Sequence, residues 1–232
     1  MASLIIKKII TEIGMNKRQF KDGTYSQSGY TEYELGPNDI PSQIFFGIGY
    51  TECPIIVQVG ANDGVCGEQY GFMSWLDSLN DFKLFLCEPL LEDYERLKEV
   101  YEKFGDKVVY CNYAITEKTG ETFMDLDSRD SGCSRINPSG STKIKTKSWE
   151  EFVNENYIEN IDILLIDCEG YEWNVFYNCM DFDEISPKKI RYEYCHLPNQ
   201  LEVDNFLKSR KYKIELCQCD PTFNKVCTLK NN

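Results

Sequence analysis

Basic residues are scarce in this chain of 232 residues. Lysine and arginine number 25 against 38 aspartates and glutamates, which gives a formal net charge of −13 at pH 7. A surface that binds a phosphate backbone or an anionic membrane needs clustered lysine and arginine. We therefore expect no nucleic-acid partner and no anionic membrane surface. The length suits one sizeable core with an additional N-terminal segment.

The chain also lacks paired cysteine motifs, although it contains 11 cysteines. No C-x-x-C spacing occurs, and no signal peptide is recognisable. Cys87, Cys168 and Cys195 lie in or beside apolar runs, where cysteine behaves as a small buried hydrophobic residue. These features predict reduced thiols in a cytoplasmic protein, with neither a disulfide framework nor a zinc site.

No uncharged apolar run is long enough to predict a membrane span. The apolar residues of Met1–Ile13 group on one side of a helix, but two consecutive lysines interrupt them. We predict a helix packed on the domain, with a membrane-surface or dimerisation helix as alternatives. Residues 21–52 mix glycine, proline and tyrosine, which suits either a wrapping arm or a substrate-side lid. The predicted division is therefore residues 1–52, the N-terminal helix and arm, and residues 53–232, the main domain.

From Pro54 onward, short apolar runs alternate with segments of helical periodicity. Apolar runs of this length are typical of buried parallel strands. The runs predicted as strands are Ile55–Val59, Lys83–Cys87, Lys107–Tyr113, Ile161–Ile166 and Ile190–Tyr194. Tyr212–Cys219 and Val226–Leu229 flank a turn and predict a hairpin. The pattern predicts an α/β fold with a doubly wound, mainly parallel seven-stranded sheet and a C-terminal antiparallel hairpin.

Between the third and fourth predicted strands, the chain is less regular. Residues 116–146 are polar and contain turn signals, so we predict a polar connection there. Ser148 and Glu151 have the spacing of a capping box, which predicts the start of a helix.

Chemically useful side chains gather where the predicted strands end. In an open α/β sheet, ligands bind outside the carboxyl ends of the strands. The side chains at these ends are those of Asn62, Asp63, Glu88, Asn112, Tyr113, Asp167, Glu169, Glu193 and His196. We therefore expect one binding site along this edge of the sheet.

The loop Gly60–Gly64 discriminates between nucleotide cofactors. It lacks the G-x-G-x-x-G pattern that lets a backbone approach a pyrophosphate, and the chain has no P-loop motif. The loop centre is Asn62 and Asp63, and a carboxylate repels pyrophosphate but can bind a cationic amino group. S-adenosylmethionine (SAM) carries such an amino group and a sulfonium, and Glu88 can accept hydrogen bonds from its ribose hydroxyls. The loop thus favours SAM, with S-adenosylhomocysteine as the product.

Two segments resemble the motifs of the FkbM family of methyltransferases. They are Val57–Gly64 and Ile163–Glu172, the second of which is similar to that family's I-D-x-E-G-x-E signature. The resemblance extends over roughly residues 54–196 and implies the class I SAM-dependent methyltransferase sheet. It also implies methylation of hydroxyl groups, often on sugars or glycosylated natural products.

By this resemblance, Gly60, Asn62 and Gly64 line the methionine part of SAM, Glu88 binds the ribose, and residues 112–114 border the adenine. The candidate cofactor-binding residues are Gly60, Ala61, Asn62, Asp63, Gly64, Glu88, Pro89, Asn112, Tyr113, Ala114 and Asp167.

Methyl transfer to an alcohol requires a group that removes the hydroxyl proton. The candidate catalytic residues are Asp167, Glu169 and His196, with Asp167 contacting the SAM amino group or the acceptor and Glu169 or His196 acting as the base. Capping of the next helix is the alternative for Asp167, and we predict Glu172 to be a solvated or helix-dipole residue. Asp167, Glu169 and Glu193 can instead supply oxygen ligands to Mg²⁺, an alternative rather than the expected cofactor.

The sequence hypothesis is therefore a SAM-dependent O-methyltransferase that acts on a sugar, a glycan or a glycosylated small molecule. One alternative is N-methylation of a small molecule or protein, although the chain has no Asn/Asp-Pro-Pro-Tyr motif. Another is a non-catalytic module that binds SAM or a glycan.

Overall fold

The computed structural model describes residues 53–64, 69–127, 131–217 and 221–230. The predicted N-terminal helix and the arm or lid lie outside the described residues. Within the described residues, no helix combines the length and the apolar character that crossing a membrane requires.

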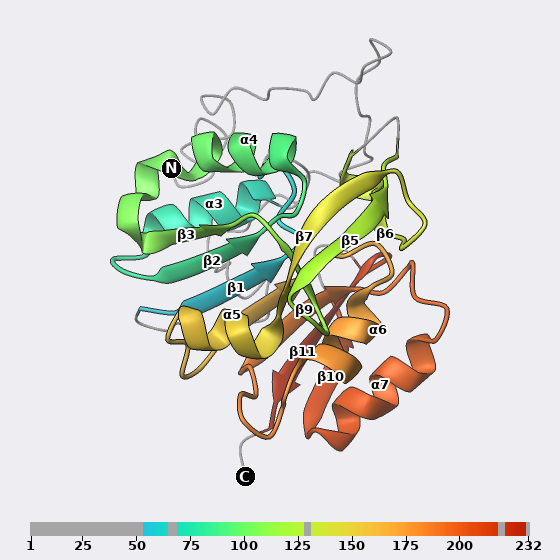
Figure 1. Ribbon diagram of the computed structural model, residues 1–232. Coiled ribbons are helices and arrows are strands. Elements are labelled where there is room, and N and C mark those ends of the chain that lie inside the picture. The colour runs from blue at the N-terminus through green and yellow to red at the C-terminus, as the bar shows by residue number, and fades with distance from the viewer. Residues whose placement is uncertain (1–52, 65–68, 128–130, 218–220, 231–232) are drawn as a thin grey trace.

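The main sheet has seven strands in the order β10-β11-β9-β8-β1-β2-β3 (Figure 1). The strands are β1 (Ile55–Val59), β2 (Lys83–Cys87), β3 (Val108–Cys111), β8 (Ile163–Ile166), β9 (Lys189–Glu193), β10 (Tyr212–Leu216) and β11 (Asn224–Leu229). The five strands β1, β2, β3, β8 and β9 pair in parallel, and β11 is antiparallel to both β9 and β10. The predicted fold class is confirmed, with one difference: the antiparallel strand lies inside the sheet, and β10 forms its edge.

Two hydrophobic cores cover the two faces of this sheet. On β1, Val57 and Val59 pack with the side chains of α5 (Trp149–Glu155) and α7 (Gln200–Ser209). Ile56 points to the opposite face and packs with α3 (Gln69–Ser78) and α4 (Leu91–Tyr101). Alternate residues of a strand point to opposite faces, so an apolar run buried on both sides is what a central parallel strand requires. Figure 1 shows α3 and α4 on one side of the sheet and α5 and α7 on the other.

Helix α5 begins at the predicted capping position. The Ser148 hydroxyl accepts a hydrogen bond from the backbone NH of Glu151 at 3.2 Å, which satisfies one free donor of the first turn. The reciprocal bond of a capping box is replaced by a relay through Thr119. Its hydroxyl accepts from the Ser148 NH at 3.0 Å and donates to the Glu151 carboxylate at 2.6 Å.

The predicted polar connection over residues 116–146 is wrong, because most of it forms a second sheet. This sheet has the order β4-β7-β5-β6, with β4 (Ala114–Thr116), β5 (Gly120–Asp125), β6 (Arg135–Ile136) and β7 (Thr142–Ser148). In β7 only Ile144 and Thr146 are buried, and Lys143 and Lys145 are exposed. A strand with a single strongly apolar residue is easily mistaken for a polar loop.

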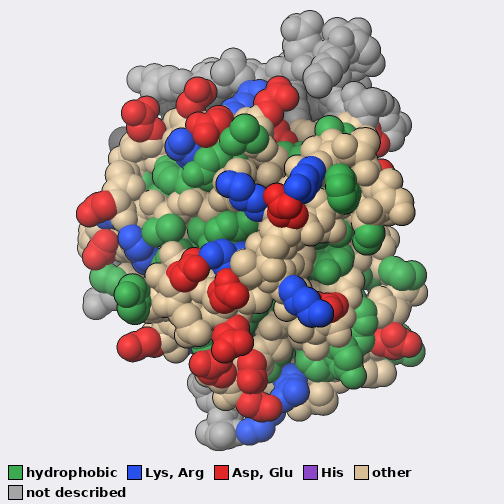
Figure 2. Space-filling model, in the orientation of Figure 1, with side chains coloured by type: hydrophobic (Ala, Val, Ile, Leu, Met, Phe, Trp, Pro, Cys, Tyr) green, Lys and Arg blue, Asp and Glu red, His purple; other side chains and the backbone are tan. Residues whose placement is uncertain are grey.

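The second sheet stands beside the carboxyl ends of β1 and β2 (Figure 1). It packs there through a small core of its own, formed by Leu90, Ala114, Met124, Ile136 and Ile144. On the face that Figure 2 shows, lysine and arginine side chains lie singly or in small groups among aspartates and glutamates. Ion pairs also link elements, as Lys147 of β7 lies 2.7 Å from Glu155 of α5.

A close backbone approach joins the loops that follow β1 and β8. Gly60 has a φ of +80°, and a Cβ atom added there would lie 1.7 Å from the carbonyl oxygen of Asp167. Only glycine fits, since any other side chain would have to separate the two loops.

We predict that Gly60→Ala is much more destabilising than Gly105→Ala, which serves as its matched control. Gly105 also has a positive φ, +57°, but nothing lies within 4 Å of its added Cβ. Backbone strain alone costs about 1–3 kcal/mol, whereas strain plus a clash with a carbonyl is expected to cost more than about 4 kcal/mol. Chemical denaturation of the two variants measures the difference. Equal free energies of unfolding would contradict the close approach.

Candidate active site

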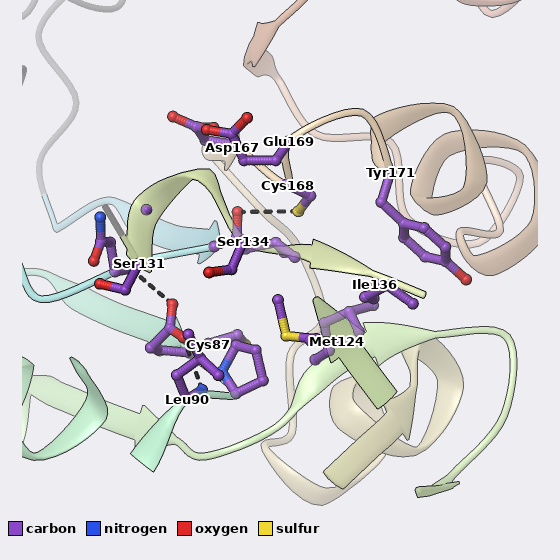
Figure 3. Close-up of a pocket in the computed structure, with 18 residues that line it drawn as sticks. Cys87, Leu90, Met124, Ser131, Ser134, Ile136, Asp167, Cys168, Glu169 and Tyr171 are labelled. Atoms are coloured by element: carbon purple, nitrogen blue, oxygen red, sulfur yellow. Dashed lines mark hydrogen bonds between the residues drawn. The ribbon is translucent and has the colours of Figure 1, made fainter. Parts of the chain in front are cut away.

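A cavity opens where the carboxyl ends of β1, β2 and β8 meet the second sheet (Figure 3). The space that it encloses is about 680 Å³, a volume that includes its open mouth. The sequence-predicted residues that line it are Gly60, Asn62, Glu88, Pro89, Ala114, Asp167 and Glu169. Residues that follow three separate strands therefore line one cavity.

The glycine loop is held against the end of β2 by backbone hydrogen bonds. The NH groups of Gly60 and Ala61 both donate to the carbonyl oxygen of Cys87 at 3.0 Å. Asn62 follows in a left-handed conformation with a φ of +50°, which asparagine tolerates better than most residues. Its backbone NH donates to the Glu88 carboxylate at 2.9 Å, which ties the β1 loop directly to the acid after β2.

Glu88 is a buried carboxylate at the floor of the cavity. Its Oε2 accepts from Asn62, and its Oε1 accepts from the backbone NH of Leu90 at 2.8 Å. Burial raises the pKa of Glu88 to about 7, assisted by the charge of Asp93 and opposed by these two NH donors. A carboxylate has about four lone-pair positions, so each oxygen keeps one for a ligand.

Several predicted cofactor residues lie behind the cavity wall. Asp63 is buried, and its carboxylate lies 3.5 Å from Arg96 Nε. Gly64 packs against Leu97 and Tyr101 of α4, and Ala61 lies in the core on the same side of the sheet.

Asn112 and Tyr113 also lie outside the cavity lining. The Asn112 side-chain amide donates to the carbonyls of Glu88 and Pro89 at 3.0 and 3.1 Å, so it supports the two residues that do line it. The Tyr113 ring packs edge-on against Phe152. Direct contact between the cofactor and these two residues stays a prediction, as it does for Ala61, Asp63 and Gly64.

Asp167 and Glu169 bring two carboxylates to the cavity beyond β8. The Asp167 backbone NH donates to the Val59 carbonyl at 3.0 Å, and the next helix, α6 (Glu172–Asn174), takes Tyr171 rather than Asp167 as its N-cap residue. Carboxylate oxygens of Asp167, Glu169 and Glu193 all lie within 4.8 Å of one another. These oxygens are spaced for a shared cation, as the magnesium alternative requires.

His196 completes this acidic cluster. Its Nδ1 lies 2.8 Å from Glu193 Oε2 and 2.9 Å from Glu169 Oε2, while Arg135 Nη2 approaches the same Glu169 oxygen at 3.7 Å. Burial raises the pKa of Glu169 to about 7, assisted by the negative charge of Glu193 and opposed by His196 and Arg135. The structure thus brings the predicted catalytic residues together: Asp167 and Glu169 line the cavity, and His196 lies outside its lining, against Glu169.

The expectation that Glu172 is solvated is wrong, whereas its place in the first turn of a helix is as predicted. Instead of being solvated, its side chain is fully buried, and its Oε1 accepts from the backbone NH groups of Cys168 and Gly170 at 2.7 and 3.3 Å. Its position in the first turn of a helix suggested exposure, whereas burial depends on how the elements pack after folding.

The contribution of the second sheet to the site was not predicted from the sequence. Met124, Ser131, Gly132, Ser134 and Ile136 line the cavity, and Arg135 stands beside its acidic end. The available signal was the period-two alternation of Thr142–Ser148, which predicts a half-buried strand and hence a sheet in this segment.

The charge of the cavity lining restricts the ligands that suit it. Among the described residues that line it, the ionisable ones are the acids Glu88, Asp167 and Glu169 together with Cys87, Cys168 and Tyr171, and none is lysine or arginine. Phosphates are bound by cationic side chains or exposed NH groups, whereas these carboxylates suit hydroxyls and cationic groups.

Comparisons with known proteins agree with this geometry. Residues 58–214 match the model of the methyltransferase FkbM domain. The hexuronic acid methyltransferase AglP of Haloferax volcanii is 26% identical over 93 residues, which is 40% of this chain and 39% of AglP. The crystal structure of a methyltransferase FkbM from Methylobacillus flagellatus KT superposes with a TM-score of 0.54 at 15% identity, over 82% of this chain and 48% of that one.

The chain thus spans less than half the length of either relative. The structural likeness supports the fold alone, because so low an identity carries no information on the substrate. The family model, in contrast, covers more than half of the chain, including the second motif, the first motif except Val57, and the residues of the cavity floor. On this match, the chain belongs to the FkbM family of methyltransferases.

Proposed function

We propose that this chain binds SAM in the cavity and transfers its methyl group to a hydroxyl of a sugar or glycan. The observation that carries the proposal is the buried Glu88 carboxylate, joined to the glycine loop, in a cavity whose lining holds acids and no lysine or arginine. The sugar acceptor is suggested by AglP, which is described as a hexuronic acid methyltransferase. Residues 53–232 would form the methyltransferase domain, with residues 1–52 as the arm on its substrate side.

The residues present suit the parts of SAM. Glu88 keeps lone pairs for two ribose hydroxyls, and Pro89, Leu90 and Ala114 supply an apolar surface for the adenine. Asp167 supplies a negative charge for the amino group at the opposite end of the cavity. SAM supplies an electrophilic methyl group on a positively charged sulfur.

His196 is the base that this arrangement favours. With its Nδ1 proton donated to Glu193, the imidazole is held as the tautomer whose Nε2 carries the free lone pair. The acceptor oxygen forms a bond to the methyl carbon as the carbon–sulfur bond breaks, and the hydroxyl proton passes to Nε2. Proton removal by the side chain accounts for the reaction without a metal ion.

We expect the protein to bind SAM and not NAD, with Glu88 as the main determinant. Glu88→Ala removes hydrogen bonds to a charged group, each worth about 1.5–3 kcal/mol, so the Kd for SAM should rise at least about tenfold. Glu92→Ala, the same change at an exposed position of α4, is the matched control and should leave the Kd unchanged. Isothermal titration measures both. NAD binding without SAM binding would overturn the proposed cofactor.

We also expect binding of the adenosine half to strengthen as the pH rises through 7. The pKa of Glu88 is raised to about 7, and only its deprotonated form accepts hydrogen bonds from both ribose hydroxyls. The affinity for 5′-methylthioadenosine, which has no group that ionises in this range, should therefore increase about tenfold between about pH 6 and about pH 8. Glu88→Gln should abolish this dependence, and Glu169→Gln, at the other end of the cavity, should retain it. A pH-independent affinity in the unmodified protein would contradict the role of Glu88.

Substitution of His196 should impair methyl transfer more than SAM binding. Loss of a general base typically lowers the rate about 10²–10⁴-fold, so His196→Asn is expected to lose kcat in this range with a Kd for SAM close to that of the unmodified protein. Transfer of labelled methyl from SAM to a panel of methyl glycosides, uronic acids and amines measures the activity. Activity that survives in His196→Asn but is abolished by EDTA would favour the magnesium mechanism at Asp167, Glu169 and Glu193.

A further inference from the structure

Glu172 is a buried carboxylate for which the proposed reaction has no direct use. It is fully buried at the start of α6, and among the described residues its Oε2 has no hydrogen-bond partner. Its Oε1 binds two backbone NH groups, those of Cys168 and Gly170. Burying a carboxylate oxygen without a hydrogen-bond partner costs free energy. A protein that keeps such a group is expected to use it for a second purpose.

The loop that Glu172 binds has an unusual conformation. Glu169 and Gly170 are consecutive residues with positive φ values of +53° and +100°. Glycine adopts this region freely, but glutamate does so only when its surroundings hold it there. The two NH donors on either side of Glu169 converge on one oxygen, in the manner of a backbone nest that encloses an anion.

The conformation of this loop decides where the Glu169 side chain lies. Cys168 and Gly170 flank Glu169, so anchoring their NH groups on one side directs the intervening side chain to the other. There the Glu169 carboxylate lines the cavity and lies 2.9 Å from His196 Nδ1. Figure 3 shows Asp167 and Glu169 together at the same side of the cavity, both carried by this loop.

From these contacts we propose that Glu172 is a positioning residue: its buried carboxylate holds the Cys168–Gly170 turn in the conformation that places Glu169 beside His196. The expected effect of Glu172 on the rate rests on the proposed methyl transfer, whereas the placing of Glu169 beside His196 does not. The charge of Glu172 also acts on Glu169 directly. The groups that surround Glu169 are Glu193 and His196 at the end of β9, Arg135 of β6, Asp167 of its own loop, and Glu172 of α6.

Two substitutions separate the anchoring oxygen from the charge. Glu172→Gln keeps an acceptor for both NH groups and removes the charge, whereas Glu172→Ala removes both. Glu202→Gln, at an exposed position in the first turn of α7, is the matched control. With labelled SAM and the same acceptor panel, Glu172→Gln should keep kcat within about threefold of the unmodified protein, and Glu172→Ala should lose more than about tenfold at a nearly unchanged Kd for SAM.

Rescue by the conservative variant is a readout that a merely structural role would not give, because Glu172→Gln keeps the acceptor that anchors the two NH groups. Loss of thermal stability in Glu172→Ala without loss of kcat in the folded protein would overturn the proposal. A loss of kcat in Glu172→Gln as large as that in Glu172→Ala would overturn it too.

A measurement independent of activity keeps the inference testable if no methyl transfer is found. His196 is the single histidine of the chain, so its imidazole gives one set of NMR signals in the untagged protein. These signals should stay near their original positions in Glu172→Gln and shift in Glu172→Ala, as Glu169 leaves Nδ1. Unchanged imidazole signals in Glu172→Ala would overturn the positioning role. Absent methyl transfer with the expected NMR shifts would instead count against the proposed function alone.

Discussion

The contact between the Gly60 backbone and the Asp167 carbonyl is the constraint on which the site depends. The loops after β1 and β8 approach so closely that a single added methyl group would lie 1.7 Å from an oxygen. Because β1 and β8 are neighbouring parallel strands, their loops leave the sheet side by side. The close approach joins the Glu88 end of the cavity to the end that Asp167 and Glu169 line, next to His196. A reaction between two ligands needs both ends held in one geometry.

Buried carboxylates are the second feature that organises the site. Glu88, Glu169 and Glu172 each have a pKa raised by burial, and each is held by backbone NH groups or by neighbouring charged side chains. A raised pKa means that the folded state holds a proton that the unfolded state would release. These acids therefore reduce stability as the pH rises from the ordinary range of glutamate toward the raised values. A cost of this kind is usual where the carboxylates have a function in binding or proton transfer.

The second sheet encloses the cavity that lies at the carboxyl ends of the main-sheet strands. It packs through a small core of its own beside the ends of β1 and β2, and it contributes Met124 and Ile136 to the cavity and Arg135 to the acidic cluster. Without it, the cavity would lack one of its walls. In folds of this class, the parallel sheet supplies a common ligand site, and added segments shape what binds there.

The sequence by itself determined the parts of this protein that depend on residues close together in the chain. Short apolar runs and the turn of the C-terminal hairpin identified the strands of the main sheet, and the Ser148 cap marked the start of α5. The glycine loop and the Ile163–Glu172 segment identified the family. Only the tertiary structure decided which partners distant residues would find. His196 meets Glu169 across 27 positions, Glu172 is fully buried, and β7 pairs with β4 and β5. Local spacing specifies backbone conformation and the direction of side chains, whereas burial and ion pairing depend on segments that meet only after folding.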